Sequence, residues 1–209
     1  VHTLTINDDD ATPTVDFTVA AQAVSEGAGT ATITAELSAA SGLPVTVPYA
    51  VSGDATDPDD YTLAPNPIVI PAGSTTADVT VTLAGDLLDE NDETVVLTIG
   101  APTNAGVGAT SVHTLTINDD DATPTVDFTT AMQSVGEGAG TATITAQLSA
   151  ASGLPVTVPY GVAGDATDPD DYTLVPNPIV IPAGMTSADV TVTLVGDLLD
   201  ENDEAVVLT

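Results

Sequence analysis

Apolar and polar residues alternate over several short stretches of the chain, and shorter apolar runs lie between them. A period of two residues places one face of a β-strand against a core and the other face in solvent. The pattern predicts about seven short strands in the first 117 residues. These stretches are residues 15–17, 31–37, 45–51, 68–70, 77–83, 94–99 and 112–117.

Turn-forming residues separate the predicted strands. Gly, Pro, Asn and Asp gather at residues 26–29, 53–60, 71–73 and 85–92, and these residue types favour turns. Pro44 and Pro48 are suited to an edge strand or a bulge. Short strands at this spacing are typical of an antiparallel β-sandwich of immunoglobulin type. The fold class predicted is therefore all-β.

The sequence is an internal repeat with a period of 111 residues. Residues 1–10 recur unchanged as residues 112–121, and residues 1–98 align with residues 112–209 without a gap. A period of 111 residues has the length of a typical domain, so we expect tandem sandwiches. We expect residues 1–10 to be the final strand of a preceding or neighbouring repeat. Residues 11–121 would then form a complete sandwich, and residues 122–209 a second sandwich that lacks its last strand.

The composition predicts a folded core built from aliphatic residues. Hydrophobic residues make up 43% of the chain and the mean hydropathy is +0.27, which disfavours intrinsic disorder. Only 2 Phe, 4 Tyr and no Trp are present, so Val, Ile, Leu, Ala and Thr must fill the interior. The absence of Cys excludes disulfides and thiolate metal sites.

The charge of the chain is entirely one-sided. Asp and Glu number 31, Lys and Arg are absent, and the formal net charge is −31. Without basic side chains, binding to nucleic acid or docking on an anionic membrane is disfavoured. Asp outnumbers Glu by 24 to 7, and Asp is common in turns and in loops that bind hard cations. A cation is therefore the partner that we expect.

Most acidic residues of one period fall in four segments: Glu26, residues 54–60, residues 86–93 and residues 119–121. Alternate loops of a sandwich lie at the same end, so these segments can meet in space. Clustered carboxylates repel one another, and a bound dication reverses that effect. Ca²⁺ accepts six to eight oxygen ligands, whereas Mg²⁺ prefers a stricter octahedron and transition metals favour imidazole or thiolate. The sequence therefore predicts bound Ca²⁺.

Five ordered motifs of one period together resemble the Calx-beta domain. That domain is the calcium-binding sandwich module of sodium/calcium exchangers, integrin-type adhesion proteins and large bacterial surface proteins. The resemblance extends along the whole period. The motifs are Glu26-Gly27, Gly53-Asp54-Ala55-Thr56 with Asp60-Tyr61, Ile70-Pro71-Ala72-Gly73, Asp86 with Asp89-Glu90-Asn91-Asp92-Glu93, and Ile117-Asn118-Asp119-Asp120-Asp121.

The resemblance implies a set of calcium ligands in each copy. In the first copy the implied side-chain ligands are Glu26, Asp60, Asp86, Glu90, Glu93, Asp119, Asp120 and Asp121, with the carbonyl of Leu88. In the second copy they are Glu137, Asp171, Asp197, Glu201 and Glu204, with the carbonyl of Leu199.

Two departures from the family pattern affect these sets. Calcium-sensing members often carry a run of acids where this chain has Gly85-Asp86-Leu87, which implies fewer ions. The second copy also lacks its own terminal Asp triplet. Asp8, Asp9 and Asp10 of a neighbouring chain, or residues that follow Thr209, would supply it.

Other interpretations of the same residues remain open. The Asp triplets could form solvated linkers, and Asp54 and Asp57 fit turns as well as ligands. His2 and His113 suggest a surface or strand-pairing role. The chain has no Trp platform for sugars, no serine elbow, no phosphate loop and no dinucleotide motif, which disfavours an enzyme.

The function expected from the sequence is a non-enzymatic, calcium-binding structural repeat of an extracellular filament or cell-surface protein. Other copies of the chain are expected partners, either in a continuous tandem array or joined head to tail by strand complementation. The alternative is a calcium-dependent adhesion or ligand-binding module. The two copies differ at only 12 of 98 aligned positions, and the differences are scattered, which favours the structural repeat.

Overall fold

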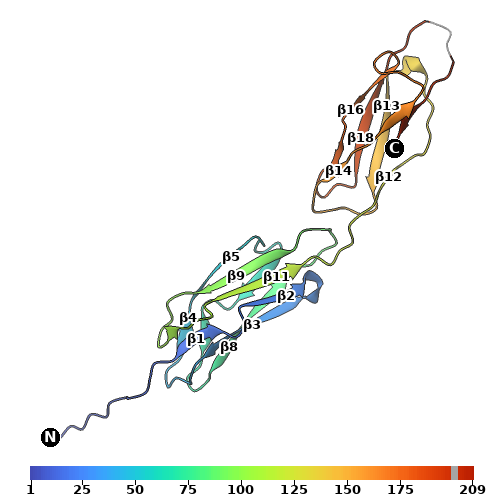
Figure 1. Cartoon of the computed structure of the whole chain (residues 1–209). Helices are drawn as coiled ribbons and strands as arrows, with labels where there is room; N and C mark the ends of the chain where they lie inside the picture. Colours follow the sequence, from blue (N-terminus) through green and yellow to red (C-terminus); the bar gives the residue numbers. More distant parts are fainter. Residues whose placement is uncertain (199–201) are drawn as a thin grey trace. The chain divides into compact units, whose positions relative to one another are not determined.

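The computed structural model describes residues 1–198 and 202–209. The residues form two compact units, Val1–Asp86 with Asn91–Asp120 and Leu87–Glu90 with Asp121–Thr209. Strands dominate both units, and the described helical segments are the short 3₁₀ turns η1 (Glu26–Ala28) and η2 (Glu137–Ala139). Among the described residues, no helix has the length and apolar character needed to cross a membrane. The all-β prediction is confirmed (Figure 1).

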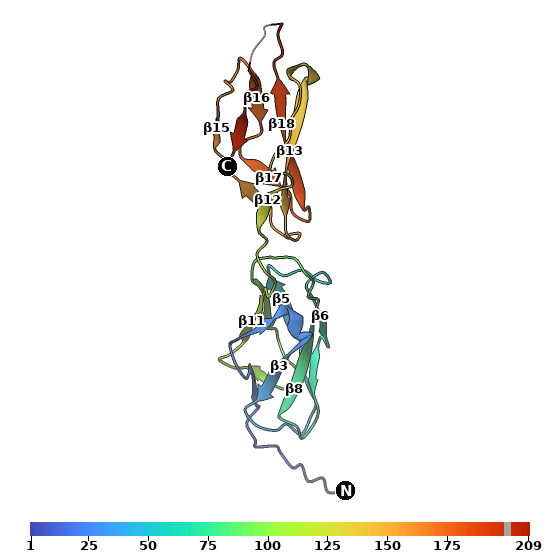
Figure 2. The same cartoon turned by 90° about the vertical axis from the view of Figure 1, so that its right-hand side faces the viewer.

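The first unit is a sandwich of two main sheets (Figure 2). One sheet has the strand order β10-β1-β3-β8-β6, the other has the order β2-β11-β9-β5, and β4 pairs with β7. The strands are β1 (Thr14–Phe17), β2 (Ala21–Ser25), β3 (Thr30–Leu37), β4 (Val45–Val47), β5 (Tyr49–Gly53), β6 (Tyr61–Ala64), β7 (Ile68–Ile70), β8 (Thr76–Leu83), β9 (Glu93–Ile99), β10 (Gly106–Val107) and β11 (Val112–Asn118).

The core of the first unit follows the alternation seen in the sequence. In β3, the side chains of Ala31, Ile33, Ala35 and Leu37 are buried, while the Thr residues between them are exposed or half-buried. Strands of both sheets contribute to one continuous apolar cluster. Burial of each large aliphatic side chain contributes about 1.5 to 3 kcal/mol, so this cluster is the main source of stability.

Proline divides one of the predicted strands. Residues 45–51 form β4 and β5 on either side of Pro48, and the two strands pair with different partners. Proline has no N–H to donate to a ladder, so the chain changes sheets there. Tyr49 begins β5 opposite Ile99, and its hydroxyl donates a hydrogen bond to the Pro65 carbonyl at 2.9 Å.

The last strand of the first repeat lies inside a sheet. β11 pairs antiparallel with β9 and parallel with β2. It therefore contributes His113, Leu115 and Ile117 to the buried face. Val112 to Asn118 thus join two strands that would otherwise each have an open edge.

The sequence suggested a surface or strand-pairing role for both histidines. His2 is exposed, whereas His113 has the pairing role, opposite Leu97 in the β11–β9 ladder, with its side chain fully buried. His113 Nδ1 lies 2.8 Å from the Val19 carbonyl oxygen, and its ring meets Phe17 edge to face with centroids 5.8 Å apart. This hydrogen bond and this ring contact offset part of the cost of burying the imidazole, whose Nε2 is buried without a hydrogen-bond partner among the described residues.

The second unit repeats the architecture in part. It has a sheet of order β12-β13-β18-β16 and two strand pairs, β14 with β17 and β15 with β19. The segment equivalent to β2, residues 132–136, is not a strand. The strands are β12 (Val126–Phe128), β13 (Thr141–Leu148), β14 (Val156–Val158), β15 (Val162–Gly164), β16 (Tyr172–Val175), β17 (Ile179–Ile181), β18 (Ser187–Leu194) and β19 (Val206–Leu208).

Candidate calcium site

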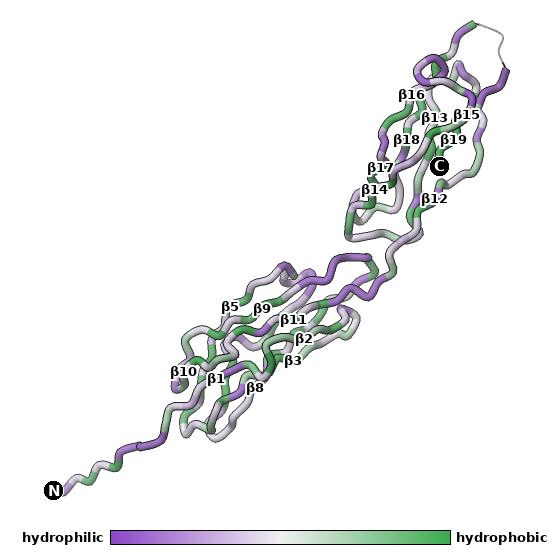
Figure 3. Tube along the Cα trace, viewed as in Figure 1, coloured by the Kyte–Doolittle hydropathy of each residue, from purple (hydrophilic) through white to green (hydrophobic). Residues whose placement is uncertain are grey.

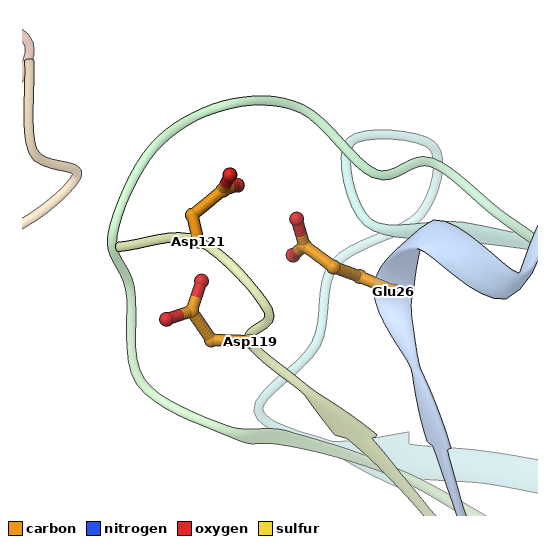
Figure 4. A group of neighbouring side chains, drawn as sticks. All are labelled: Glu26, Asp119 and Asp121. Atoms are coloured by element: carbon orange, nitrogen blue, oxygen red, sulfur yellow. The ribbon is translucent and has the colours of Figure 1, made fainter. Parts of the chain in front are cut away.

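Three acidic side chains meet at the end of the sheet that contains β2 and β11. The two strands run parallel, with Asn118 opposite Ser25, so the residues that follow them leave the sheet side by side. Glu26 begins η1 after β2, and Asp119 and Asp121 follow β11. One carboxylate oxygen from each of the three lies within 4.8 Å of the others, and all three residues are half-buried. Figure 4 shows the three side chains converging.

The middle residue of the Asp triplet has a different contact. The Ser25 hydroxyl donates a hydrogen bond to Asp120 Oδ2. The same oxygen lies 2.8 Å from the position that a Cβ at Gly27 would occupy, so a glycine there leaves room for this carboxylate. Asp120 is exposed and lies outside the three-residue group.

The loop after β8 passes close to the same group. A Cβ at Gly85 would lie 3.1 Å from the Glu26 carbonyl oxygen, which shows how closely the backbone before Asp86 approaches η1. The Asp119 N–H donates a hydrogen bond to Asp92 Oδ1 at 3.1 Å. At one end of the loop at residues 85–92, Gly85 thus lies close to the backbone of Glu26. At the other end, Asp92 contacts the backbone of Asp119.

Several predicted ligands of the first copy are not part of the three-residue group found among the described residues. Glu93 begins β9 opposite Ile117, and Asp86 is exposed. The acidic residues outside the group are Asp60, Asp86, Glu90, Glu93 and Asp120, and the Leu88 carbonyl stays a prediction.

Asp60 closes a local turn in the first copy. Its Oδ2 accepts hydrogen bonds from the Thr56 N–H at 2.6 Å and the Thr56 hydroxyl at 2.9 Å. Both contacts are made within five residues of the chain. They give this carboxylate a structural role within the loop that precedes β6.

Asp171 makes the same turn contacts in the second copy. Thr167 donates its N–H at 2.6 Å and its hydroxyl at 2.8 Å to Asp171 Oδ2. These bonds, the backbone one foremost, hold the pKa of Asp171 below its usual value. The nearby Glu204 side chain contributes further to this lowering of the pKa. Two predicted ligands of the second copy therefore lie close together.

Asp54 accepts hydrogen bonds from a residue distant in sequence. The Thr94 N–H and hydroxyl donate to Asp54 Oδ1 at 2.6 and 2.5 Å. The hydroxyl bond, followed by the backbone bond, lowers the pKa of Asp54. In the second copy the Ala205 N–H donates to Asp165 Oδ1 at 2.7 Å, and the hydroxyl is missing because Ala205 replaces Thr94. The Asp54 carboxylate thus holds the start of β9 in place. The sequence left open whether Asp54 forms a turn or binds an ion.

Apart from Asp171, the predicted ligands of the second copy and of residues 8–10 that the structure describes are exposed. Glu137, Asp197 and Glu204 are exposed, and Leu199 and Glu201 lie outside the described residues. Asp8, Asp9 and Asp10 are also exposed, with the Asp10 N–H donating to Asp8 Oδ1 at 3.3 Å. Glu137 is more exposed than its counterpart in the first copy, Glu26, which is half-buried.

The chemistry of the three-residue group suits a hard dication. Two carboxylate charges within 4.8 Å of each other repel by about 3 kcal/mol or more at an effective dielectric near 20, and no Lys or Arg exists in the chain to offset this. Carboxylate and carbonyl oxygens are the ligands that Ca²⁺ prefers, in shells of six to eight. The donor set of Glu26, Asp119 and Asp121 therefore fits Ca²⁺.

Comparison with known proteins identifies the family. The family model of the Calx-beta domain matches residues 8–121 and residues 119–209. The chain belongs to the Calx-beta family. The prediction made from the five sequence motifs is therefore confirmed, and the chain contains this calcium-binding type of domain in two tandem copies. A search of curated protein sequences found no match.

Solved structures similar to this Calx-beta chain include tandem and single domains. The crystal structure of CBD12 from CALX1.2 is 19% identical, covering 93% of this chain and 79% of that chain with a TM-score of 0.48. The calcium binding domain CBD12 of CALX1.1 is 19% identical over 88% and 76%, with a TM-score of 0.49. The apo-form Calx CBD1 domain is 18% identical over 53% and 100%, with a TM-score of 0.49.

Proposed function

We propose that this Calx-beta tandem is a non-enzymatic structural module whose domains are made rigid by bound Ca²⁺. The observation that supports the proposal is the convergence of Glu26 with Asp119 and Asp121. These residues follow two strands that are adjacent in the sheet but distant in sequence. An ion bound there would therefore link the end of β2 to the end of the last strand of the repeat.

Bound Ca²⁺ would stabilise the folded domain by mass action. The three carboxylates are brought together only when β2 and β11 are paired, so the unfolded chain offers no equivalent site. A ligand that binds only the native state adds about 2.7 kcal/mol of stability at a hundredfold excess over its Kd. Oxygen atoms from the loop at residues 85–92, which touches Glu26 and Asp119, would complete the shell.

The joint between the copies is part of the proposal. Asp121 is followed by the short segment Ala122 to Thr125, which leads into β12 at Val126. Because Asp119 and Asp121 form the acidic group immediately before this segment, an ion there would restrain the chain where one repeat ends. Ca²⁺ would in this way stiffen the joint as well as the domain.

We place the module in an extracellular filament or a cell-surface protein. Extracellular calcium modules operate with Kd values of about 10⁻⁴ to 10⁻³ M, a range in which a group of three half-buried carboxylates can be filled. Two nearly identical copies suit a spacer that repeats one unit. In a filament, neighbouring copies would be joined head to tail by strand complementation.

An adhesion role is the second candidate. A surface cavity of about 440 Å³ in the first unit is lined in part by Tyr49, Tyr61 and Asn66, and a small ligand would bind there. However, both tyrosines are only 6% exposed, so their rings pack into the core instead of presenting a face to a sugar. The spacer role is therefore preferred.

Isothermal titration calorimetry of the 209-residue chain with Ca²⁺ and, separately, Mg²⁺ tests the calcium proposal. We expect saturable binding of Ca²⁺ and weaker binding of Mg²⁺, since Mg²⁺ needs a strict octahedron and dehydrates reluctantly. A chain that shows no saturable Ca²⁺ binding at millimolar concentrations would rule the proposal out.

A further inference from the structure

A cavity opens between the two sheets of the first unit at one side of the sandwich. β5 and β6 are end strands of their sheets, and residues of both line the cavity of about 440 Å³. Val51 of β5 lies opposite the buried Leu97, and Leu63 of β6 lies opposite the buried Val81. Directly opposite residues of a ladder share a face, so both side chains point toward the interior. Val51 is nevertheless 40% exposed, because the cavity lies beside it.

The backbone of β5 presents hydrogen-bonding groups along its outer edge. The Gly100 N–H donates to the Pro48 carbonyl at 2.8 Å, and bonded pairs alternate along an antiparallel ladder. The N–H and C=O groups of Val51 therefore face away from β9, where none of the described strands pairs with β5. The Tyr49 carbonyl faces the same way and accepts a hydrogen bond from the Asn66 side chain at 3.1 Å. A side chain thus takes the place of a neighbouring strand at Tyr49, and the position of such a strand is open at Val51.

β5 lacks the features that usually keep an edge strand from pairing. Such strands carry charged residues, Pro or bulges, and Tyr49–Gly53 includes neither a charged residue nor Pro. Figure 3 shows its hydrophobic positions and the hydrophilic, Asp-rich loop that follows at residues 54–60. An extended segment can add to an edge of this kind through main-chain hydrogen bonds, while its alternate side chains enter adjoining pockets.

Asp57 supplies the charge of the cavity. Its side chain is exposed and lines the cavity, whereas Asp60 is held by hydrogen bonds from Thr56. Burial, and secondarily the charges of Asp57 and Asp60, raises the pKa of Tyr61, which also lines the cavity. A basic group in the cavity would therefore meet the Asp57 carboxylate close to the phenol of Tyr61.

We propose that β5 is the docking edge for an extended segment of a basic partner protein. The segment would pair with Val51, pack an apolar side chain against Val51 and Leu63, and place a basic side chain beside Asp57 from the same face. A second copy of this chain does not fit as the occupant, because it has no Lys or Arg and its net charge of −31 opposes its approach. The inference goes beyond the spacer role and does not depend on calcium.

NMR titration of the isotope-labelled 209-residue chain with synthetic peptides tests the inference. The probe is the end-capped peptide Thr-Lys-Thr-Val-Thr-Lys-Thr, in which Val and both Lys share one face of an extended chain. The matched control peptide, Thr-Thr-Lys-Val-Lys-Thr-Thr, has the same composition and charge but places Lys and Val on opposite faces.

We expect saturable shifts of the Val51 and Leu63 amide signals with the probe and protection of the Val51 N–H from hydrogen exchange. Ala23 in β2, at the other end of the sheet that contains β5, should be unaffected. The control peptide should bind more weakly. Equal binding of the two peptides, or shifts confined to the acidic residues 86–93 and 119–121, would show general attraction of a cation to an acidic protein and would overturn the inference.

Two variants test the backbone contact and the charge contact separately. Val51→Pro removes the outward N–H and keeps the ladder bonds that Ala50 and Ser52 make to β9, so it should abolish probe binding while the β9 amides remain protected. Asp57→Asn should weaken probe binding by about threefold to fivefold, as expected for one exposed ion pair. The matched control Asp59→Asn, in the same loop but outside the cavity lining, should have little effect. Unchanged binding to Val51→Pro, or equal weakening by the two Asn variants, would contradict docking at β5.

Discussion

The Ser25 hydroxyl donates a hydrogen bond to Asp120 Oδ2. This contact gives the middle carboxylate of the triplet a different partner from its two neighbours, which form a group with Glu26. Three consecutive aspartates therefore have two roles, since successive side chains of an extended segment point in opposite directions. The division makes the calcium proposal testable at single positions.

Replacing Asp119 or Asp121 by Asn should weaken calcium binding by about tenfold or more, equivalent to about 1.4 kcal/mol. The reason is that each change removes a negative charge from the three-residue group. Asp120→Asn removes the same charge from the adjacent residue and should change the Kd by much less. Calorimetric titration of the three variants measures this, and equal losses at all three positions would contradict the assignment.

Leu115→Ala should destabilise the first unit by about 3 kcal/mol or more, because the side chain is fully buried and its removal leaves a cavity. Leu4→Ala changes the same residue in the same local sequence, but Leu4 is exposed. Leu4→Ala should therefore lower the free energy of unfolding of the monomer by less than about 0.5 kcal/mol. Urea unfolding at a concentration too low for assembly measures both. A large effect of Leu4→Ala there would show that residues 1–7 already pack in the monomer.

The strands could be predicted from the sequence because the alternation reports burial directly. Ile33 and Ala35 alternate with Thr in the sequence and are buried in the structure. For His113 the sequence suggested a surface or strand-pairing role, and it did not indicate that the side chain is buried in β11. Its burial depends on Val19 and Phe17, which lie more than ninety residues away in the sequence, so the local pattern could not reveal these contacts.

The family and the acid-rich loops could also be predicted from the sequence. Which acidic side chains meet in one group, and which make other contacts, could not. Asp119 and Asp120 are adjacent and chemically identical, and only their partners differ. Asp120 accepts a hydrogen bond from Ser25, whereas Asp119 lies in the group with Glu26. Asp60 has a recognisable local partner, because Thr56 lies one turn before it. Such local contacts can be anticipated from spacing, whereas contacts between loops depend on the register of the sheet.

Asp54→Asn should lower stability at neutral pH and have little effect in strong acid. The hydrogen bonds from Thr94 depress the pKa of Asp54 below the ordinary value of 3.8. A depressed pKa contributes stability that is present above 3.8 and is lost as the pH falls through the folded-state value. Urea midpoints of the variant and the wild type should therefore differ at neutral pH and converge in acid.

Thr94→Ala provides the matched variant for this pair, because it reproduces the Ala205 found beside Asp165 in the second copy. It removes the hydroxyl bond and leaves the backbone bond. We expect Thr94→Ala to lose less stability at neutral pH than Asp54→Asn. Its urea midpoint should likewise converge with that of the wild type in acid. A difference between wild type and either variant that is independent of pH would contradict the role assigned to the Asp54 carboxylate.

The Tyr49 hydroxyl should titrate at unusually alkaline pH. Burial, and secondarily the proximity of Tyr61, raises its pKa above 10.0. Because folding favours the neutral phenol, this contribution to stability is complete below pH 10.0 and is lost as the pH rises toward the folded-state value. Ultraviolet titration of wild type and Tyr49→Phe should show one fewer late-titrating tyrosine in the variant. Identical alkaline titration curves, apart from amplitude, would contradict the prediction.

Thermal unfolding of the 209-residue chain in excess Ca²⁺ and in EGTA tests the central claim most directly. Binding at a hundredfold excess over Kd adds about 2.7 kcal/mol. For a domain of about 100 residues this corresponds to an increase in Tm of about 10 °C or more. The account predicts this increase for the wild type and for Asp120→Asn, and a much smaller one for Asp119→Asn and Asp121→Asn. The same Tm in Ca²⁺ and in EGTA would contradict it.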